Sequence, residues 1–374
     1  MKYRRLGNTN TQVSVIGLGC RGFGRRNVSE DDCIRTVHVA LDNGVNFFDT
    51  ADVYGDGQSE TILGKALRGK PRESYVLATK GGSERLPGVG ERQNGDPGFL
   101  RKALEGSLRR LGVDCIDLYQ FHNPDPAVPL SATAEAFARF VEEGKVRYVG
   151  VSNMSSRELR EWLSYIRETV SIQLPYSVAD IRRVSSLYST GEFQQVSLIP
   201  WTPLFNGWLV KPPPRERDKR AGLAAAFSDE FVHALNDAAR EIADIAQKRG
   251  FSPASVALAF VTAHPAVATV PVGATTAEHL LENIKACDVT LDAGDLERLT
   301  RVAQGMPEPE VVVRLKVTGA LDNGLVAVLE MGAKVRVDEP VKSGDEIEVD
   351  MWSLRVKAVH RVTPRFGPGQ AVPD

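Results

Sequence analysis

The chain has 374 residues, which corresponds to about two average domains or to one large domain with an appendage. Hydrophobic residues make up 42% of it and charged residues 25%, a globular composition that excludes a disordered, collagen-like or purely disulfide-held chain. The 46 basic and 48 acidic residues leave a formal net charge of −2, so there is no broad basic surface for nucleic acid. We therefore expect a folded protein that does not bind nucleic acid.

The cysteines and the apolar stretches favour a protein with no metal site and no membrane segment. The four cysteines, at positions 20, 33, 115 and 287, have neither CxxC nor Cys/His ligand spacing, so we expect reduced thiols. The apolar segment 13–20 follows a basic N-terminus but is too short for a signal peptide. Residues 251–277 lack Asp, Glu, Lys and Arg, but prolines interrupt them, which favours a buried helix followed by a strand. We expect a cytoplasmic protein.

Short apolar segments alternate with amphipathic helical segments along most of the chain. The predicted strands are residues 13–19, 45–51, 75–81, 117–122, 148–153, 170–176, 197–204 and 267–273. Most are nearly continuous apolar runs, which is typical of parallel strands covered on both faces. Helix starts are marked by Ser29, by Ser155 with Glu158, and by Ser252 before Pro253. Eight βα units favour a closed (β/α)₈ barrel, because a doubly wound sheet usually has about six strands and two open edges.

The last part of the chain has a different pattern. After Met306, apolar and polar residues alternate with period two, and turn signals occur at 322–324 and 342–345. We therefore expect a barrel over residues 1–306 and a small antiparallel β domain over 307–374, ending in a frayed tail. This β domain is a candidate surface for homo-oligomer formation. Within the barrel, the charged segment 211–220 fits either a mobile cover over one face or a solvated surface loop.

A glycine cluster near the N-terminus imitates a dinucleotide-binding fingerprint. Gly17, Gly19 and Gly22 have GxGxxG spacing after the first predicted strand, and Asp49 ends the next strand. That fingerprint needs its last glycine inside an opening helix, whereas here residues 23–27 intervene before the helix cap at Ser29. The sequence therefore does not favour a Rossmann domain.

Four residues with ionisable side chains lie at or just beyond the ends of consecutive predicted strands. Asp49, Lys80 and His122 end the second, third and fourth strands, and Tyr54 follows Asp49 by a few residues. The C-terminal ends of barrel strands meet at one face, where active sites lie. Each residue alone has an ordinary explanation, such as a helix cap, a half-exposed lysine or a hydrogen-bonded histidine. Their shared position favours a catalytic cluster.

At these residues the sequence resembles the aldo-keto reductases. DTADVYG at 49–55, TKG at 79–81, His122, VSN at 151–153, Gln173 and Glu282-Asn283 match that family in order and register, and the resemblance covers residues 1 to about 305. It implies a (β/α)₈ barrel, a nicotinamide cofactor, a small-molecule substrate, no metal, and a catalytic tetrad of Asp49, Tyr54, Lys80 and His122.

Elementary chemistry gives this tetrad a mechanism. Reduction of a carbonyl needs a hydride at carbon and a proton at oxygen, and a phenol with an ordinary pKa near 10 holds its proton at neutral pH. Lys80 beside Tyr54 would favour the phenolate and make Tyr54 a better acid, while Asp49 would keep Lys80 charged and in place. His122 would orient the carbonyl oxygen and stabilise the negative charge that develops on it.

The resemblance also implies the cofactor site. Ser152, Asn153 and Gln173 would bind the nicotinamide carboxamide, Trp201 would stack on its ring, and Glu282 with Asn283 would hold adenine. A helix capped by Thr275 or Thr276 would present free N–H groups to a phosphate. The full set of expected cofactor-binding residues is Gly19, Cys20, Arg21, Asp49, Ser152, Asn153, Gln173, Trp201, Thr202, Pro203, Leu204, Gly207, Gly273, Thr275, Thr276, His279, Glu282 and Asn283.

One departure bears on the choice between NADH and NADPH. Relatives that prefer NADPH usually carry Arg or Lys around the positions of Gly273 and Thr275, and often Arg or Gln at His279, to hold the 2′-phosphate. This chain has no cation at those two positions, so we expect weak discrimination or a preference for NAD(H). An arginine from the 211–220 segment, Arg215 or Arg217, is the alternative source of charge.

The main hypothesis is an NAD(P)-dependent oxidoreductase that interconverts a carbonyl and an alcohol in a polar small molecule, such as a sugar or a secondary metabolite. A first alternative is a redox-neutral, epimerase-type enzyme that retains its nicotinamide cofactor. A second is a redox-sensing regulatory subunit, because the β subunits of potassium channels also resemble this family. The intact tetrad favours an enzyme.

Overall fold

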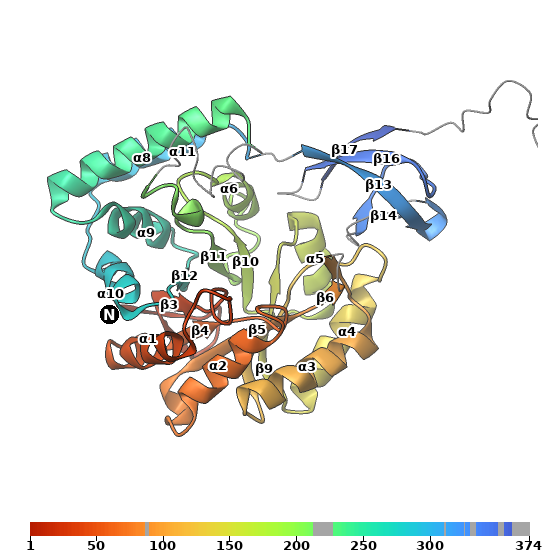
Figure 1. Cartoon of the computed structure of the whole chain (residues 1–374), viewed down its shortest axis with the longest axis horizontal. Helices are drawn as coiled ribbons and strands as arrows, with labels where there is room; N and C mark the ends of the chain where they lie inside the picture. The colour runs from red at the N-terminus through yellow and green to blue at the C-terminus, as the bar shows by residue number, and fades with distance from the viewer. Residues whose placement is uncertain are drawn as a thin grey trace, which may run out of the picture. The chain divides into compact units, whose positions relative to one another are not determined.

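The computed structural model describes residues 1–86, 90–211, 227–309, 312–324, 326–329, 334–350 and 355–360. The chain divides into two compact units (Figure 1). The first contains residues 1–85 and 93–309, and the second contains residues 86–92 and 310–374. Apart from Lys211, the charged segment 211–220 lies outside the described residues, and so does the predicted tail.

The first unit is built on a sheet of eight parallel strands. The strands are β3 (Ile16–Gly19), β4 (Phe47–Asp49), β5 (Val76–Gly81), β8 (Ile116–Phe121), β9 (Val146–Ser152), β10 (Ser171–Pro175), β11 (Ser197–Trp201) and β12 (Val270–Gly273). They pair in the order β11-β10-β9-β8-β5-β4-β3-β12. A parallel bridge between Leu198 of β11 and Val267, which precedes β12, brings the sheet close to a closed barrel. The predicted (β/α)₈ class is confirmed, and each predicted strand overlaps one of the eight.

The first predicted strand needs one correction. Residues 13–19 form two strands, because β2 (Gln12–Ser14) leaves the barrel sheet and pairs antiparallel with β1 (Tyr3–Arg5). The N–H of Val15, at the break between β2 and β3, donates to the carbonyl of Lys2 at 2.9 Å. The extra apolar residues at the start of the segment therefore belong to an N-terminal hairpin.

Helices surround the barrel (Figure 1). They are α1 (Glu30–Asp42), α2 (Gln58–Leu67), α3 (Pro97–Leu111), α4 (Leu130–Glu142), α5 (Ser156–Tyr165), α6 (Arg182–Tyr188), α8 (Asp229–Arg249), α9 (Pro253–Ala263), α10 (Ala277–Ile284) and α11 (Ala293–Gly305). Short 3₁₀ turns are η1 (Arg72–Ser74), η2 (Phe205–Gly207) and η3 (Lys285–Cys287). Strands β6 (Ser83–Leu86) and β7 (Gly90–Gln93) form a separate two-stranded sheet. Predicted caps at Ser29, Ser155 and Ser252 each accept a backbone N–H of the first turn. No helix in the described ranges is both long and apolar enough to cross a membrane.

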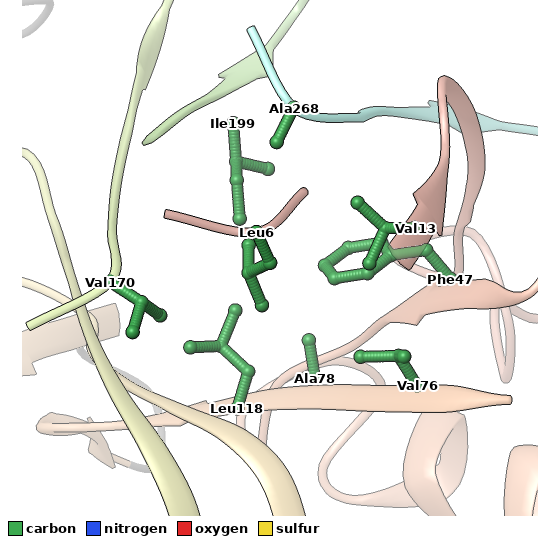
Figure 2. Close-up of a cluster of buried hydrophobic side chains, with 9 residues drawn as sticks. All are labelled: Leu6, Val13, Phe47, Val76, Ala78, Leu118, Val170, Ile199 and Ala268. Atoms are coloured by element: carbon green, nitrogen blue, oxygen red, sulfur yellow. The ribbon is translucent and has the colours of Figure 1, made fainter. Parts of the chain in front are cut away.

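The N-terminal hairpin covers one end of the barrel. Figure 2 shows Leu6 at the centre of a buried apolar cluster whose other members are Val13, Phe47, Val76, Ala78, Leu118, Val170, Ile199 and Ala268. Leu6 has no exposed surface. Gly7 beside it has φ of +58°, and a Cβ there would lie 2.7 Å from the carbonyl oxygen of Val170, so this close approach requires glycine. The hairpin thus seals the barrel end formed by the strand starts.

The second unit is a small antiparallel sheet with its own core. Its strands β13 (Val312–Leu321), β14 (Val326–Leu329), β15 (Lys334–Arg336), β16 (Glu346–Asp350) and β17 (Arg355–His360) pair in the order β15-β14-β13-β16-β17. The turn η4 (Asp322–Gly324) joins β13 to β14. Period-two alternation puts one set of side chains on the buried face: Val317, Ala327, Leu329, Val335, Val337, Val341, Ile347 and Val349. The predicted antiparallel β character is confirmed.

Candidate active site

The sheet register brings the four predicted catalytic residues to the C-terminal ends of neighbouring strands. Asp49 is the last residue of β4, Lys80 lies one residue before the end of β5, and His122 directly follows β8. Tyr54 lies in the turn between β4 and α2. Backbone bonds fix these ends, since the His122 N–H donates to Gly81 at 2.9 Å. Residues separated by more than 70 positions therefore meet at one face, as expected for a barrel of this kind.

Lys80 and Asp49 form a buried ion pair. The Lys80 Nζ donates to Asp49 Oδ2 at 2.6 Å and to the carbonyl oxygen of Thr50 at 2.8 Å, and the two charged side chains are only 1% and 7% exposed. Burial lowers the pKa of Lys80, but the Asp49 carboxylate and the Tyr54 phenol together outweigh that effect and raise it above its usual value. Lys80 is therefore an ammonium group at neutral pH.

Tyr54 lies between this ion pair and His122. The Lys80 Nζ is 5.0 Å from the centroid of the Tyr54 ring. The Tyr54 and His122 rings meet edge to face, with their centroids 5.9 Å apart and their planes at 82°. Burial, followed by the positive charges of Lys80 and Arg21, lowers the pKa of His122 to about 3. A neutral imidazole at this position can donate one hydrogen bond to an oxygen atom placed beside Tyr54.

Asn153 connects the His122 end of the site to Trp201. Its φ of +60° is a left-handed conformation that asparagine tolerates. The Asn153 Nδ2 donates to the carbonyl oxygen of His122 at 3.1 Å and to Asn123 Oδ1 at 2.9 Å, while the Trp201 Nε1 donates to Asn153 Oδ1 at 3.2 Å. Both amide hydrogens of Asn153 are thus used within the protein, and only its oxygen has acceptor capacity left for a ligand.

The other predicted nicotinamide-binding residues line the same face. Ser152 and Gln173 are paired in the sheet register and are 1% and 3% exposed. The Ser152 Oγ donates to the carbonyl oxygen of Gln173 at 3.2 Å. After β11 the chain turns tightly, with positive φ at Thr202 and Gly207. This turn carries the remaining predicted residues of the segment, Pro203 and Leu204.

The first βα loop and the loop before α10 lie against each other. Gly19 pairs with Gly273, and a Cβ on Gly22 would lie 2.6 Å from the Thr275 side chain. Cys20 is buried after β3 and Arg21 beyond it is exposed. Thr276, rather than Thr275, caps α10 by accepting the His279 N–H, so the N-terminus of α10 opens beside these glycines. Free helix N–H groups and close backbone approach suit a phosphate.

The predicted adenine-binding residues lie on α10. Asn283 is 6% exposed, and Glu282 accepts a hydrogen bond from the Lys285 Nζ at 2.8 Å. That ammonium group, followed by the Ser252 hydroxyl, lowers the pKa of Glu282 below its usual value. The carboxylate is therefore anionic at neutral pH and can accept a hydrogen bond from an amino group. Together with the glycine cradle, this arrangement fits a dinucleotide.

The sequence did not predict one residue that contacts the buried Lys80–Asp49 ion pair. Gln120 has no exposed surface, and its Nε2 donates to Asp49 Oδ1 at 3.1 Å. The period of two in a strand could have found it, because Gln120 lies two residues before His122 and faces the same side.

A second missed group lies behind the strand ends. Glu60 on α2 is fully buried, accepts from the Thr79 hydroxyl at 2.6 Å and binds the Arg110 guanidinium at 2.6 Å. Burial and the nearby Glu60 carboxylate raise the pKa of Asp52 to about 8. These residues tie α2 and α3 to the strand that carries Lys80. Among the described residues, no group of three or more His, Cys, Asp or Glu side chains is arranged to hold a metal ion.

The chain is similar to proteins of known structure and to one family model. A family model described as the aldo/keto reductase family matches residues 15–304. The glycerol dehydrogenase AKR11B4 from Gluconobacter oxydans is 28% identical, with a TM-score of 0.72 over 82% of this chain and 97% of that one. The holo form of aldo-keto reductase AKR11C1 from Bacillus halodurans is 30% identical, with a TM-score of 0.68 over 81% and 96%. The thermostable aldo-keto reductase Tm1743, in complex with the inhibitor epalrestat, is 28% identical, with a TM-score of 0.65 over 81% and 100%.

Proposed function

Since the chain belongs to the aldo/keto reductase family, an enzyme family that uses nicotinamide cofactors, we propose that it interconverts a carbonyl and an alcohol on a polar small molecule. The observation that carries the proposal is the buried Lys80–Asp49 ion pair beside Tyr54, with a neutral His122 on the other side of that phenol. A structural neighbour named glycerol dehydrogenase supports a hydroxylated, polar substrate.

Each member of the tetrad has a distinct task. The bound nicotinamide supplies the hydride, and Tyr54 supplies the proton that the carbonyl oxygen needs. The Lys80 ammonium stabilises the phenolate that remains, and Asp49 holds that ammonium in place. Neutral His122 donates a hydrogen bond to the carbonyl oxygen and stabilises its developing charge. In the direction of alcohol oxidation, Tyr54 accepts the proton instead.

The cofactor would be held by the strand ends and by α10. In this proposal Gln173, Ser152 and the free acceptor site of Asn153 bind the carboxamide, and Trp201 packs on the ring. The α10 N-terminus and the glycine cradle take the pyrophosphate, and Glu282 with Asn283 takes the adenine. With Thr275 rather than a cation beside the 2′ position, NAD(H) binds at least as well as NADP(H).

The proposal is tested with the purified full chain, NADH or NADPH, and a panel of aldoses, hydroxyketones and simple aldehydes. We expect the enzyme to consume reduced nicotinamide and to form one equivalent of alcohol. The loss of nicotinamide absorbance measures the first, and product chromatography measures the second. An isomerised product without net nicotinamide consumption would support the redox-neutral alternative. Tight nicotinamide binding without turnover of any compound would support the regulatory one.

A further inference from the structure

The side chains of β8 form an outward row and an inward row, and Gln120 is a buried amide in the inward row. Tyr119 and Phe121 point outward, where Tyr119 stacks on Phe137 with ring centroids 5.2 Å apart. Gln120 and His122 belong to the opposite, inward row of the strand. Gln120 is fully buried there, between the apolar cluster around Leu118 and the catalytic face. An amide at this depth needs a reason, because burying it costs free energy unless it is hydrogen-bonded.

The contacts of Gln120 lead to the catalytic ion pair. Its Nε2 donates to Asp49 Oδ1 at 3.1 Å, while its Oε1 is buried without a hydrogen-bond partner among the described residues. The opposite amide orientation would set Oε1 against a carboxylate oxygen, two acceptors facing each other. Leucine would fill a similar volume without an unpaired acceptor, so the amide is a poor choice for packing and is explained by the bond to Asp49.

That bond completes a chain of hydrogen bonds that runs from Gln120 through Asp49 to Lys80, the neighbour of Tyr54. Gln120 occupies one oxygen of Asp49, and Lys80 occupies the other at 2.6 Å. Lys80 has three N–H donors, of which Asp49 and the Thr50 carbonyl use two. The ammonium group also lies 5.0 Å from the centroid of the Tyr54 ring. Fixing the plane of the Asp49 carboxylate therefore fixes the position of the Lys80 ammonium relative to Tyr54.

We propose that Gln120 is a positioning residue of the reaction proposed above: by holding Asp49 Oδ1 it fixes the carboxylate plane, and through it the aim of the Lys80 ammonium at Tyr54. This inference rests on the proposed function, because it assigns Gln120 a role only through Tyr54. Gln120 touches neither substrate nor cofactor in this role. Its removal changes the proton transfer and leaves binding intact.

The first test is Gln120→Leu, measured as kcat, KM and nicotinamide dissociation constant across pH. We expect kcat to fall about tenfold or more, the factor that one hydrogen bond to a charged group contributes. The dissociation constant should stay within about twofold of the parent value, because the residue does not reach the cofactor. A kcat equal to that of the parent at every pH would overturn the proposal.

Gln120→Glu gives a sharper test and covers the case in which Gln120→Leu does not fold. At low pH the introduced carboxylic acid is protonated and can still donate to Asp49 Oδ1, so kcat should stay near the parent value. As the pH rises, two carboxylates cannot both be charged in one buried site without repulsion, and kcat should fall earlier than in the parent. Parent-like pH dependence in this variant would also overturn the proposal.

Tyr119→Phe is the matched control on the same strand. The Tyr119 hydroxyl is buried and has no hydrogen-bond partner among the described residues, but it lies on the outward row. Its removal should leave kcat and the pH profile unchanged. A loss of kcat equal to that of Gln120→Leu would mean that any disturbance of β8 reduces activity, which would overturn the specific role. Failure of the parent enzyme to turn over any carbonyl would instead count against the proposed function.

Discussion

The two ends of the barrel are built from the same strands but differ in the polarity of the side chains that they bury. At the end sealed by the N-terminal hairpin, the strands contribute a cluster of buried apolar side chains, such as Phe47 on β4 and Leu118 on β8. At the other end the same two strands finish in Asp49 and lead into His122. Only a few residues along each strand thus separate the packed apolar core from the buried ion pair.

The difference indicates which end of the barrel contributes to stability and which end contributes to the proposed chemistry. The hairpin end gains free energy chiefly from removing apolar surface from water. The catalytic end buries charges and keeps Gln120 Oε1 and His122 Nδ1 without hydrogen-bond partners among the described residues. Such groups cost stability, and functional sites are where proteins retain them. We expect substitutions at the two ends to separate folding from turnover.

The largest effect is expected for Tyr54→Phe at the catalytic end. Loss of the proton donor should reduce kcat by about 10²–10⁴-fold, while the nicotinamide dissociation constant and the thermal midpoint change little. Steady-state kinetics, fluorescence titration and thermal unfolding measure the three quantities. Near-normal turnover by this folded variant would remove Tyr54 from the mechanism.

Leu6→Ala at the sealed end should have the opposite consequences. Truncating this fully buried side chain should cost about 2–5 kcal/mol in the free energy of unfolding, because a cavity remains in the cluster. The kcat of the folded fraction should be unchanged. Urea unfolding and kinetics on the same preparations check both, with Val141→Ala on the exposed side of α4 as the control. A tenfold loss of kcat would show that the two ends are coupled.

Thr275→Arg should change the ligand preference of the catalytic end without changing its chemistry. The new guanidinium would lie beside Gly22 and the α10 N-terminus, where it can form a charge-assisted bond to a 2′-phosphate. We expect the ratio of the NADH to the NADPH dissociation constant to rise about tenfold, with kcat nearly constant. Thr275→Ser serves as the neutral control. An unchanged ratio would place the 2′-phosphate elsewhere.

A last expected effect concerns the pH dependence of stability. Because the pKa of His122 is lowered to about 3, the unfolded chain binds a proton there below about pH 6.5 that the folded chain does not. Stability should therefore fall as the pH decreases from 6.5 towards 3, by at most about 1.4 kcal/mol per pH unit for this group. His122→Gln should show a shallower decline in urea unfolding. His233→Gln on α8 is the control, and equal slopes in both variants would contradict the expectation.

Local sequence signals predicted the helices and strands more readily than the pairing between strands. The caps at Ser29 and Ser252 and the period-two pattern after Met306 are readable because they depend on neighbouring residues. The splitting of residues 13–19 was not readable, because it depends on pairing with the N-terminal strand β1. The choice of Thr276 over Thr275 as the cap of α10 likewise depended on backbone geometry.

The sequence by itself determined the order of eight βα units, and the ionisable residues at the strand ends, because hydrophobic period and residue type are local properties. Only the tertiary structure decided which atoms meet. Gln120 meets Asp49 because the register of β4, β5 and β8 sets its amide against that carboxylate. Asn153 proved to connect His122 with Trp201 because three strand ends converge on it. Such contacts join residues far apart in the chain, and their distances follow from closing the barrel rather than from any local pattern.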